Sequence, residues 1–332
     1  MTGLPGGVAT GVGSLPGTDI VEAVKTVFGE LPDLPYLPEL PARGPGADLT
    51  GRTAGLLVDL PVELYAAQWR LTARPGADLR RTDDLRERDL DALTEQADSY
   101  AGPLKLQVAG PWTLAATLDL PIGGRVLRDS GAVRDLTDSL AEGLAGHLAE
   151  VRARVPGAEL TLQLDEPALP AVLAGAVPTE SGLHRYRPVE ASAAETALRR
   201  VVERVGVPVV VHCCAREVPV ALLRSGGAAA VSLDLELLEL DDPKAIDPLG
   251  EALDAGFGLF AGAVPTAPPV PTAADVADRV RTLWRRFGFA PEKLPEQVVV
   301  TPACGLAGAT PTHARDVTTV CREAAHRLTD AP

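Results

Sequence analysis

The chain has 332 residues, 46% of them hydrophobic, and a formal net charge of −14. This acidic balance argues against a nucleic-acid partner, because phosphate groups are bound by basic surfaces. No run of about 18 apolar residues occurs, so we expect no membrane span. The first five residues lack the basic and apolar regions of a signal peptide, and we therefore expect a cytoplasmic protein.

Short apolar runs alternate along the chain with stretches of helical periodicity. We predict eight strands, at 7–13, 35–39, 104–109, 160–165, 208–213, 228–233, 257–263 and 297–301. Several are rich in β-branched residues, as in Pro208–His212 and Gln297–Thr301. Continuous apolar runs of this kind are typical of buried parallel strands.

The segments between these runs show the spacing of amphipathic helices. We predict helices at 131–154, 190–205, 215–224, 244–255, 273–287 and 312–328. Eight strands with helical connections predict an α/β fold, a single-domain (β/α)8 TIM barrel over residues 1–332, with a doubly wound open sheet as the alternative. Two stretches rich in Pro or Gly, 31–61 and 264–272, are predicted as long loops at the active-site face.

The chain contains four cysteines, too few for a disulfide framework in a cytosolic protein of this size. His212 and Cys214 end a predicted strand. Because side chains alternate along a strand, these two share one face while Cys213 points the other way. We expect Cys213 and Cys321 to be ordinary core or helix-packing residues. A redox pair of Cys213 with Cys214 is an alternative.

Two further strand ends add side chains of metal-ligand type. Cys304 follows the last predicted strand, and Asp234 ends an intervening one. Imidazole, two thiolates and a carboxylate from such strand ends would make a tetrahedral Zn²⁺ site, and thiolates select Zn²⁺ over hard cations. A site of this kind suits holding a substrate thiol as a nucleophilic thiolate near neutral pH.

Three other strand ends carry candidate substrate-binding groups. Asp165 could bind a substrate ammonium or act as a base, or else cap a helix with Pro167 at an early position. Glu39 is a second candidate for a substrate amine, with a solvated loop residue as the alternative. The backbone amides at Gly13 and Ser14 could bind a carboxylate, or else form an ordinary tight turn.

Six segments carry a resemblance to a known family: Gly13–Pro16, Gly110–Thr113, Asp165–Leu169, His212–Cys214, Val231–Asp234 and Pro302–Leu306. Taken together and in this order, they resemble the C-terminal catalytic barrel of the cobalamin-independent methionine synthase family. They extend from the first predicted strand to the last. The resemblance implies a barrel of the type shared with uroporphyrinogen decarboxylase.

The resemblance also implies a function. It implies a Zn²⁺ cofactor bound by His212, Cys214, Cys304 and Asp234, at which homocysteine sulfur accepts a methyl group to give methionine. The amino-acid end of homocysteine would be held by a second set of residues, Gly13, Ser14, Asp165 and Glu39.

Several departures from the family pattern concern the methyl donor and the fourth zinc ligand. Asp234 stands where the family has Glu, so Glu236 is an alternative ligand. The family's second barrel is absent from this chain, and its catalytic His after the seventh strand has no counterpart in 260–266. The family's tryptophan shortly after the Gly110–Thr113 segment is also missing, and Thr117 lies near its place. Trp112, inside that segment, could supply an aromatic surface instead. The donor is expected to be methyltetrahydrofolate or a methylated corrinoid protein. The departures fall on the folate side and favour the corrinoid protein, which arrives already reactive and would not need a general acid.

Three other functions remain open at this point. One is methyl transfer to another small thiol, and a second is a non-catalytic zinc barrel that binds homocysteine or methionine. The third is a decarboxylase acting on a porphyrinogen. That enzyme would leave the cysteines unexplained and would need more arginines than Arg43 and Arg52 in the loop 31–61.

Overall fold

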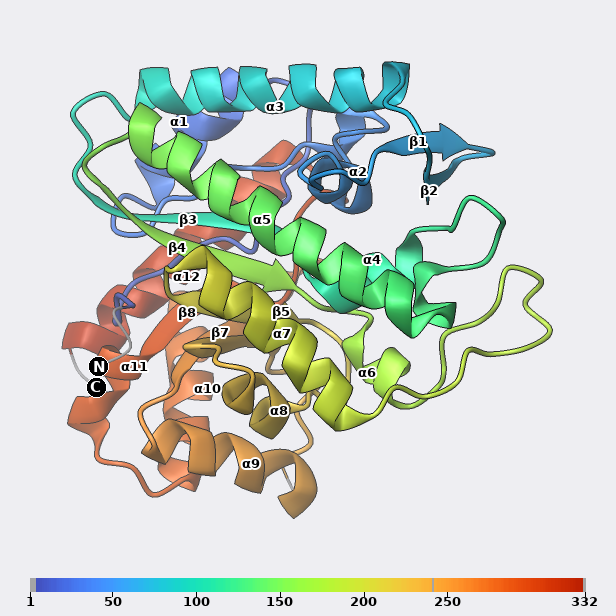
Figure 1. Ribbon diagram of the computed structural model, residues 1–332. Helices are drawn as coiled ribbons and strands as arrows, with labels where there is room; N and C mark the ends of the chain where they lie inside the picture. Colours follow the sequence, from blue (N-terminus) through green and yellow to red (C-terminus); the bar gives the residue numbers. More distant parts are fainter. Residues whose placement is uncertain (1–3, 241, 331–332) are drawn as a thin grey trace.

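The main sheet of the protein is a curled parallel sheet with helices on its outer side (Figure 1). The computed structural model describes residues 4–240 and 242–330, apart from the side chain of Ala245. Six strands neighbour one another in chain order: β3 (Gly102–Ala109), β4 (Ala158–Asp165), β5 (Val209–Cys213), β6 (Ala230–Asp234), β7 (Gly258–Val264) and β8 (Val298–Pro302). Each of them overlaps a strand predicted from the sequence.

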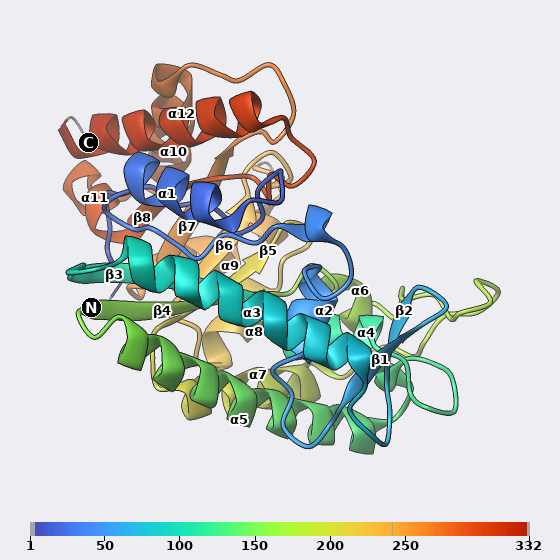
Figure 2. The ribbon, with the colours of Figure 1, turned by 90° about the horizontal axis from the view of Figure 1, so that it is seen from above.

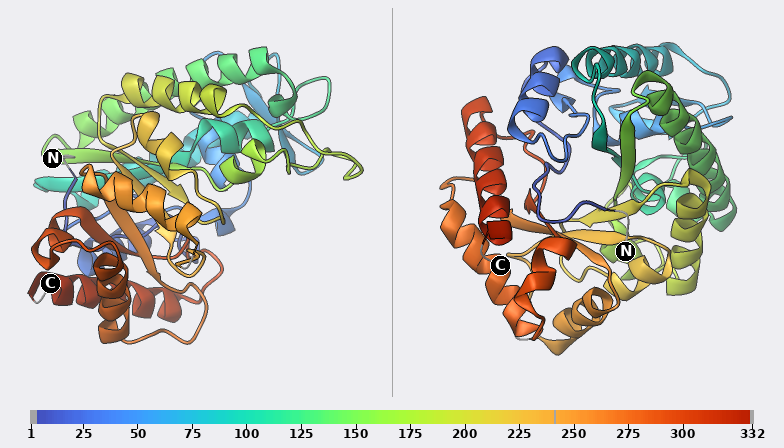
Figure 3. Two further views of the ribbon diagram at one scale, coloured as in Figure 1. Left: turned by 90° about the horizontal axis from the view of Figure 1, so that it is seen from below. Right: turned by 90° about the vertical axis from the view of Figure 1, so that its left-hand side faces the viewer.

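Two extended segments complete the ring between β8 and β3. Isolated parallel bridges pair Ala9 with Val300, Ser14 with Glu39, and Tyr36 with Lys105. Prolines at 35 and 38 lack an N–H donor, and glycines at 11 and 13 weaken strand pairing, which explains why bridges replace full ladders here. Seen from one side, the helices surround the strands (Figure 3). The predicted TIM barrel is confirmed, and the open-sheet alternative is wrong.

Most of the predicted helices are present. The helices are α1 (Ile20–Glu30), α2 (Leu49–Ala54), α3 (Ala77–Gln96), α4 (Pro111–Thr117), α5 (Ser130–Arg154), α6 (Leu169–Leu173), α7 (Ala191–Val205), α8 (Val220–Ser225), α9 (Pro243–Asp254), α10 (Ala273–Arg286), α11 (Leu294–Gln297) and α12 (Pro311–Asp330), with 3-10 turns η1 (Pro41–Arg43), η2 (Val126–Arg128) and η3 (Pro291–Lys293). Within the described residues, none combines the length and apolar character needed to cross a membrane.

The predictions for 215–224 and 31–61 need correction. Only 220–225 is helical, because Pro219 takes the N-cap position and Glu217 has a φ of +58°, outside the right-handed helical region. The segment 31–61 is not one loop, since it holds η1 and α2 as well as the extended segment before Glu39. The loop 265–272 between β7 and α10 matches its prediction.

An unpredicted antiparallel hairpin follows α2. It pairs β1 (Val62–Tyr65) with β2 (Gln68–Leu71). The two turn residues, Ala66 and Ala67, both have positive φ values, 48° and 64°. A two-residue hairpin of this type usually carries Asn or Gly at those positions, so Ala-Ala gave no turn signal.

The interior of the barrel changes from apolar to polar along the strands. One small apolar cluster is contributed by four strands of the barrel and by the extended segment before Glu39. Its residues are Leu34, Val210, Ala230, Phe260 and Val299. Two residues further along β5 and β6, the same face carries His212 and Ser232. Because alternate residues share a face, the carboxyl end of the barrel interior is the polar end, where barrel enzymes place their sites.

Candidate metal and substrate site

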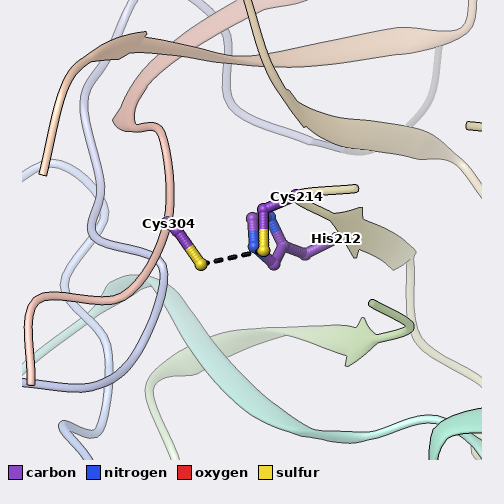
Figure 4. A group of neighbouring side chains, drawn as sticks. All are labelled: His212, Cys214 and Cys304. Atoms are coloured by element: carbon purple, nitrogen blue, oxygen red, sulfur yellow. Dashed lines mark hydrogen bonds between the residues drawn. The ribbon is translucent and has the colours of Figure 1, made fainter. Parts of the chain in front are cut away.

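Three ligand-type side chains meet at the carboxyl end of the barrel. The ligand atoms of His212, Cys214 and Cys304 all lie within 4.8 Å of one another. His212 belongs to β5 and Cys214 follows it, whereas Cys304 follows β8. The Sγ atoms of the two cysteines are 2.9 Å apart, with Cys304 facing the other two residues across the gap between their strands (Figure 4).

His212 presents an unpaired nitrogen to this group. Its Nδ1 lies 2.9 Å from the Ser232 hydroxyl on β6, while its Nε2 is buried without a hydrogen-bond partner. A buried polar atom left unpaired is costly, so this nitrogen is suited to a ligand that the protein atoms do not supply. Metal-binding imidazoles are commonly oriented by a hydrogen bond at their second nitrogen, as Ser232 does here.

The pKa values of the two thiols are shifted in opposite directions. The hydrogen bond between the two thiols holds the pKa of Cys304 well below its usual range, and the nearby His212 adds to the effect. The same hydrogen bond and burial raise the pKa of Cys214. One imidazole nitrogen and two sulfurs, one of them readily ionised, are the donors of a thiophilic tetrahedral cation. The residues present therefore fit the predicted metal.

The predicted acidic ligand stands apart from the three residues. Asp234 ends β6 half-buried, and its Oδ1 accepts a hydrogen bond from the Glu236 amide at 2.8 Å. Burial raises the pKa of Asp234, and the charge of Cys304 contributes, so the carboxyl lies in the electrostatic range of the cysteines. Glu236 is exposed and pairs with Arg279 at 3.1 Å. The fourth ligand remains a prediction.

Asp165 lies beside His212 inside the barrel. The two residues are Cα partners between β4 and β5. Gln163 donates to the Asp165 carboxylate at 2.7 Å, and burial raises the pKa of Asp165 to about 7. The N-cap position of the following helix, α6, is occupied by Ala168 and has no side-chain hydrogen bond, so the helix-cap alternative is wrong for Asp165.

The capping role belongs to the next residue. Glu166 is fully buried and accepts hydrogen bonds from the Trp112 amide (2.9 Å), the Thr113 amide (2.7 Å) and the Thr113 hydroxyl (2.8 Å) at the start of α4. The Trp112 ring is buried, and its indole N–H donates to the Ala194 carbonyl of α7 at 3.1 Å. Trp112 therefore packs outward against a helix, and the suggestion that it supplies an aromatic surface at the site is wrong.

Gly13 and Ser14 contact both Glu39 and the Cys304 loop. The Glu39 amide donates to the Gly13 carbonyl at 3.1 Å, and the Leu306 amide donates to the Ser14 carbonyl at 2.8 Å. A Cβ on Gly305 would overlap the Ser14 hydroxyl, so the residue after Cys304 lies directly against Ser14. The structure thus places Gly13 and Ser14 next to the loop that carries Cys304.

Sequence reasoning missed two buried polar residues of the barrel interior, Lys105 and Gln163. Lys105 Nζ and Gln163 Nε2 both donate to the Val12 carbonyl, at 3.0 and 2.7 Å. Burial lowers the pKa of Lys105 to about 8, against the opposing charges of Asp165 and Glu39. The available signal was a polar residue at alternate positions of an otherwise apolar strand.

Glu39 is buried and belongs to an ionic chain. Arg52 Nε lies 3.5 Å from its carboxylate, and Arg52 Nη1 lies 2.9 Å from buried Asp89. Arg43 also pairs with Asp89, at 2.6 Å. The solvated-loop alternative for Glu39 is therefore wrong. Arg43 and Arg52 are therefore already paired with carboxylates of the protein itself. They do not form the arginine-rich cleft that the carboxylates of a porphyrinogen would need.

The comparisons with known proteins agree with this site. The model for the cobalamin-independent synthase catalytic domain matches residues 8–327. The chain belongs to this family. Members of the cobalamin-independent synthase family share the barrel described above, and the His212, Cys214 and Cys304 group is compatible with the metal site typical of them.

A solved structure shares the fold of this family member over almost its whole length. It is a B12-independent methionine synthase from a Shewanella species, in complex with selenomethionine, and it matches with a TM-score of 0.61 at 14% sequence identity. The match covers 98% of each chain. No curated protein matches the chain in sequence.

Proposed function

We propose that the protein is a zinc-dependent methyltransferase that transfers a methyl group to the thiol of L-homocysteine, giving L-methionine. The observation that carries the proposal is the group of His212, Cys214 and Cys304, with an unpaired buried imidazole nitrogen at the polar end of the barrel. These residues would hold Zn²⁺, with Asp234 as fourth ligand. When bound, Zn²⁺ stabilises the thiolate form of a substrate thiol near neutral pH.

The neighbouring residues support an amino-acid thiol as substrate. Asp165 is the Cα partner of His212, and Glu39 is joined to Gly13 and Ser14 through the backbone. Two buried carboxylates can bind an ammonium group, and the backbone amides at Gly13 and Ser14 can bind a carboxylate. The solved Shewanella protein contains selenomethionine, an amino acid of the class proposed here as product.

The methyl donor is proposed to be methyltetrahydrofolate or a methylated corrinoid protein. Residues 260–266 contain no His, and Trp112 packs against α7. One imidazole reaches the loop after β7 from elsewhere: His313 Nε2, at the start of α12, lies 3.0 Å from the Thr266 carbonyl. A corrinoid donor would need no general acid, whereas transfer from a folate nitrogen needs one.

Assays of methyl transfer by the purified protein test the proposal. We expect methionine to form from homocysteine with at least one of the two donors. We expect 4-mercaptobutanoate, which lacks the amine, to be methylated at least about a hundredfold more slowly, because Asp165 would lose its charged partner and Glu39 would keep only Arg52. Equal rates for both thiols would favour a general thiol methyltransferase. Tight homocysteine binding without turnover from either donor would favour a non-catalytic zinc barrel.

A further inference from the structure

A second cavity lies on the outside of the barrel, between helices α5 and α7. The two helices run side by side (Figure 1), and a cavity of about 630 Å³ lies at their N-terminal ends. None of its lining residues belongs to the group of His212, Cys214 and Cys304. Its volume is within the range of about 300–1,000 Å³ that small-molecule sites occupy.

The inner wall of this cavity is apolar. Trp112, Leu127, Val133 and Ala197 line it, and all four are buried. The indole N–H of Trp112 already donates to the Ala194 carbonyl, so the ring offers only apolar surface. A flat apolar group would remove this wall from water and bury its own surface in the same step.

The rim of the cavity is basic, in contrast to the rest of the molecule. Four arginines line it, namely Arg128, Arg134, Arg187 and Arg200, whereas Asp138 is its one acidic lining residue. The whole chain carries 45 acidic residues against 31 basic ones. This local reversal of charge would attract an anion to a protein that otherwise repels one.

Two of these guanidinium groups are available to a ligand. Arg200 pairs with Asp138 at 2.8 Å, and Arg128 donates to the Gly123 carbonyl at 3.1 Å. Arg134 and Arg187 make no hydrogen bond or ion pair with the residues of 4–240 and 242–330, although the charge of Arg134 contributes to lowering the pKa of the exposed Asp129. Guanidinium groups bind carboxylates, phosphates and sulfonates through paired N–H donors and also pack on aromatic rings.

We propose that this cavity binds a small amphiphilic organic anion: a flat, apolar, preferably aromatic body that carries at least one carboxylate, phosphate or sulfonate. The body would lie on the wall formed by Trp112 and Val133, and the anionic group would meet Arg134 and Arg187. An acidic protein surface would satisfy the arginines but would leave the concave apolar wall unused. The proposal does not depend on the methyl-transfer reaction.

Binding of two matched probes to the full-length protein tests this site. The first probe is 8-anilino-1-naphthalenesulfonate, and the second is N-phenyl-1-naphthylamine, which has the same aromatic body without the charge. By calorimetric titration we expect about one sulfonate per chain to bind, at least about tenfold more tightly than the neutral probe. Equal affinities, or sulfonate binding at many sites, would overturn the proposal.

Variants locate the binding. The double variant Arg134→Ala with Arg187→Ala should bind the sulfonate about tenfold or more weakly than the wild type. Arg152→Ala, an exposed arginine at the opposite end of α5, is the matched control and should leave the affinity unchanged. Ala193→Trp, on an exposed lining position of α7, should fill the cavity and abolish binding. Undiminished binding in the double variant or in Ala193→Trp would place the probe elsewhere and refute the site.

Discussion

At the scale of single residues, Gln163 connects two parts of the proposed substrate site. Its side-chain amide donates to the Asp165 carboxylate and to the Val12 carbonyl, both at 2.7 Å. The first hydrogen bond orients a carboxylate proposed to bind the substrate amine. The second anchors the residue that precedes Gly13. Gln163 is therefore a positioning residue for both ends of the amino-acid group.

Gln163→Leu should raise KM for homocysteine about tenfold or more, because hydrogen bonds to charged groups are worth about 1.5–3 kcal/mol. The zinc content should not change, since Gln163 is not among the three ligands. Gln297→Leu is the control: its amide also donates to backbone carbonyls, those of Leu253 and Phe257, but at the far end of the barrel. A KM equal to that of the wild type would show that Gln163 has no role in substrate binding.

His147 on α5 should make stability sensitive to acid. Its Nδ1 is buried without a partner, and burial lowers its pKa to about 4, with help from the positive charges of Arg52 and Arg86 and against Glu150. The unfolded chain takes up this proton near pH 6.5, whereas the folded chain resists it to about pH 4. The neutral His147 side chain therefore contributes to the unfolding free energy fully above pH 6.5. This contribution, up to about 3 kcal/mol, is lost as the pH falls toward 4.

His147→Gln should flatten this pH dependence. The quantity to measure is the difference in unfolding free energy between pH 7.5 and pH 4.5, from urea titrations, because the substitution also changes packing. His326→Gln, at an exposed position of α12, should leave the difference as in the wild type. An unchanged difference in His147→Gln would mean that another group titrates.

The metal-site residues were predictable one by one, whereas their supports were not. His212, Cys214 and Cys304 end predicted strands, and alternation fixes which of two adjacent cysteines faces inward. Ser232, Lys105 and Gln163 take their meaning from partners on neighbouring strands, which only the closed ring defines. The sequence shows that they are polar, but not what they hold in place.

At the scale of elements, the start of α4 depends on a residue from another strand. Its N-terminal amides at Trp112 and Thr113 donate to Glu166, which follows β4. Gly110 at the N-cap position supplies no side chain for this purpose. The cap therefore joins β3, α4 and β4 at the end of the barrel where Asp165 lies.

Glu166→Gln should lower the unfolding free energy by about 1–3 kcal/mol, because the new NH2 group faces backbone donors and one hydrogen bond is lost. The measurement is a urea titration at pH 8, since burial raises the pKa of Glu166 to about 7. Glu190→Gln is the matched control, because Glu190 occupies the N-cap position of α7 without a side-chain hydrogen bond there. Equal stability of both variants would contradict the capping role.

Helices and strands could be predicted where the hydrophobic periodicity was strong. The residues at which they begin and end could not be predicted. The six ladder strands follow apolar runs, whereas the first two depend on isolated bridges through proline- and glycine-rich sequence. The hairpin of β1 and β2 turns through two alanines in left-handed geometry, a cost that tertiary contacts must offset. The helix predicted at 215–224 begins only at Val220, because Pro219 and the positive φ of Glu217 precede it.

At the scale of the whole molecule, barrel closure brings distant residues to one point. Cys304 and Cys214 are 90 positions apart in sequence, and Ser14 approaches the Cys304 loop from the other end of the chain. Helices α3 and α5 lie side by side on the outside (Figure 2), joined by ion pairs such as Arg86 with Glu150 at 2.7 Å. The order of motifs along the chain anticipated this arrangement, because each motif sits at a strand end and parallel strand ends share one face.

Metal content tests the central claim most directly. Elemental analysis of zinc-replete preparations should find about one zinc per chain in the wild type and in Cys321→Ala, whose cysteine is buried in α12. Cys304→Ala should lose most of that zinc while remaining folded, as shown by an unchanged circular dichroism spectrum. A wild type without zinc, or a Cys304→Ala protein that retains it, would contradict the proposed metal site and with it the activation of homocysteine.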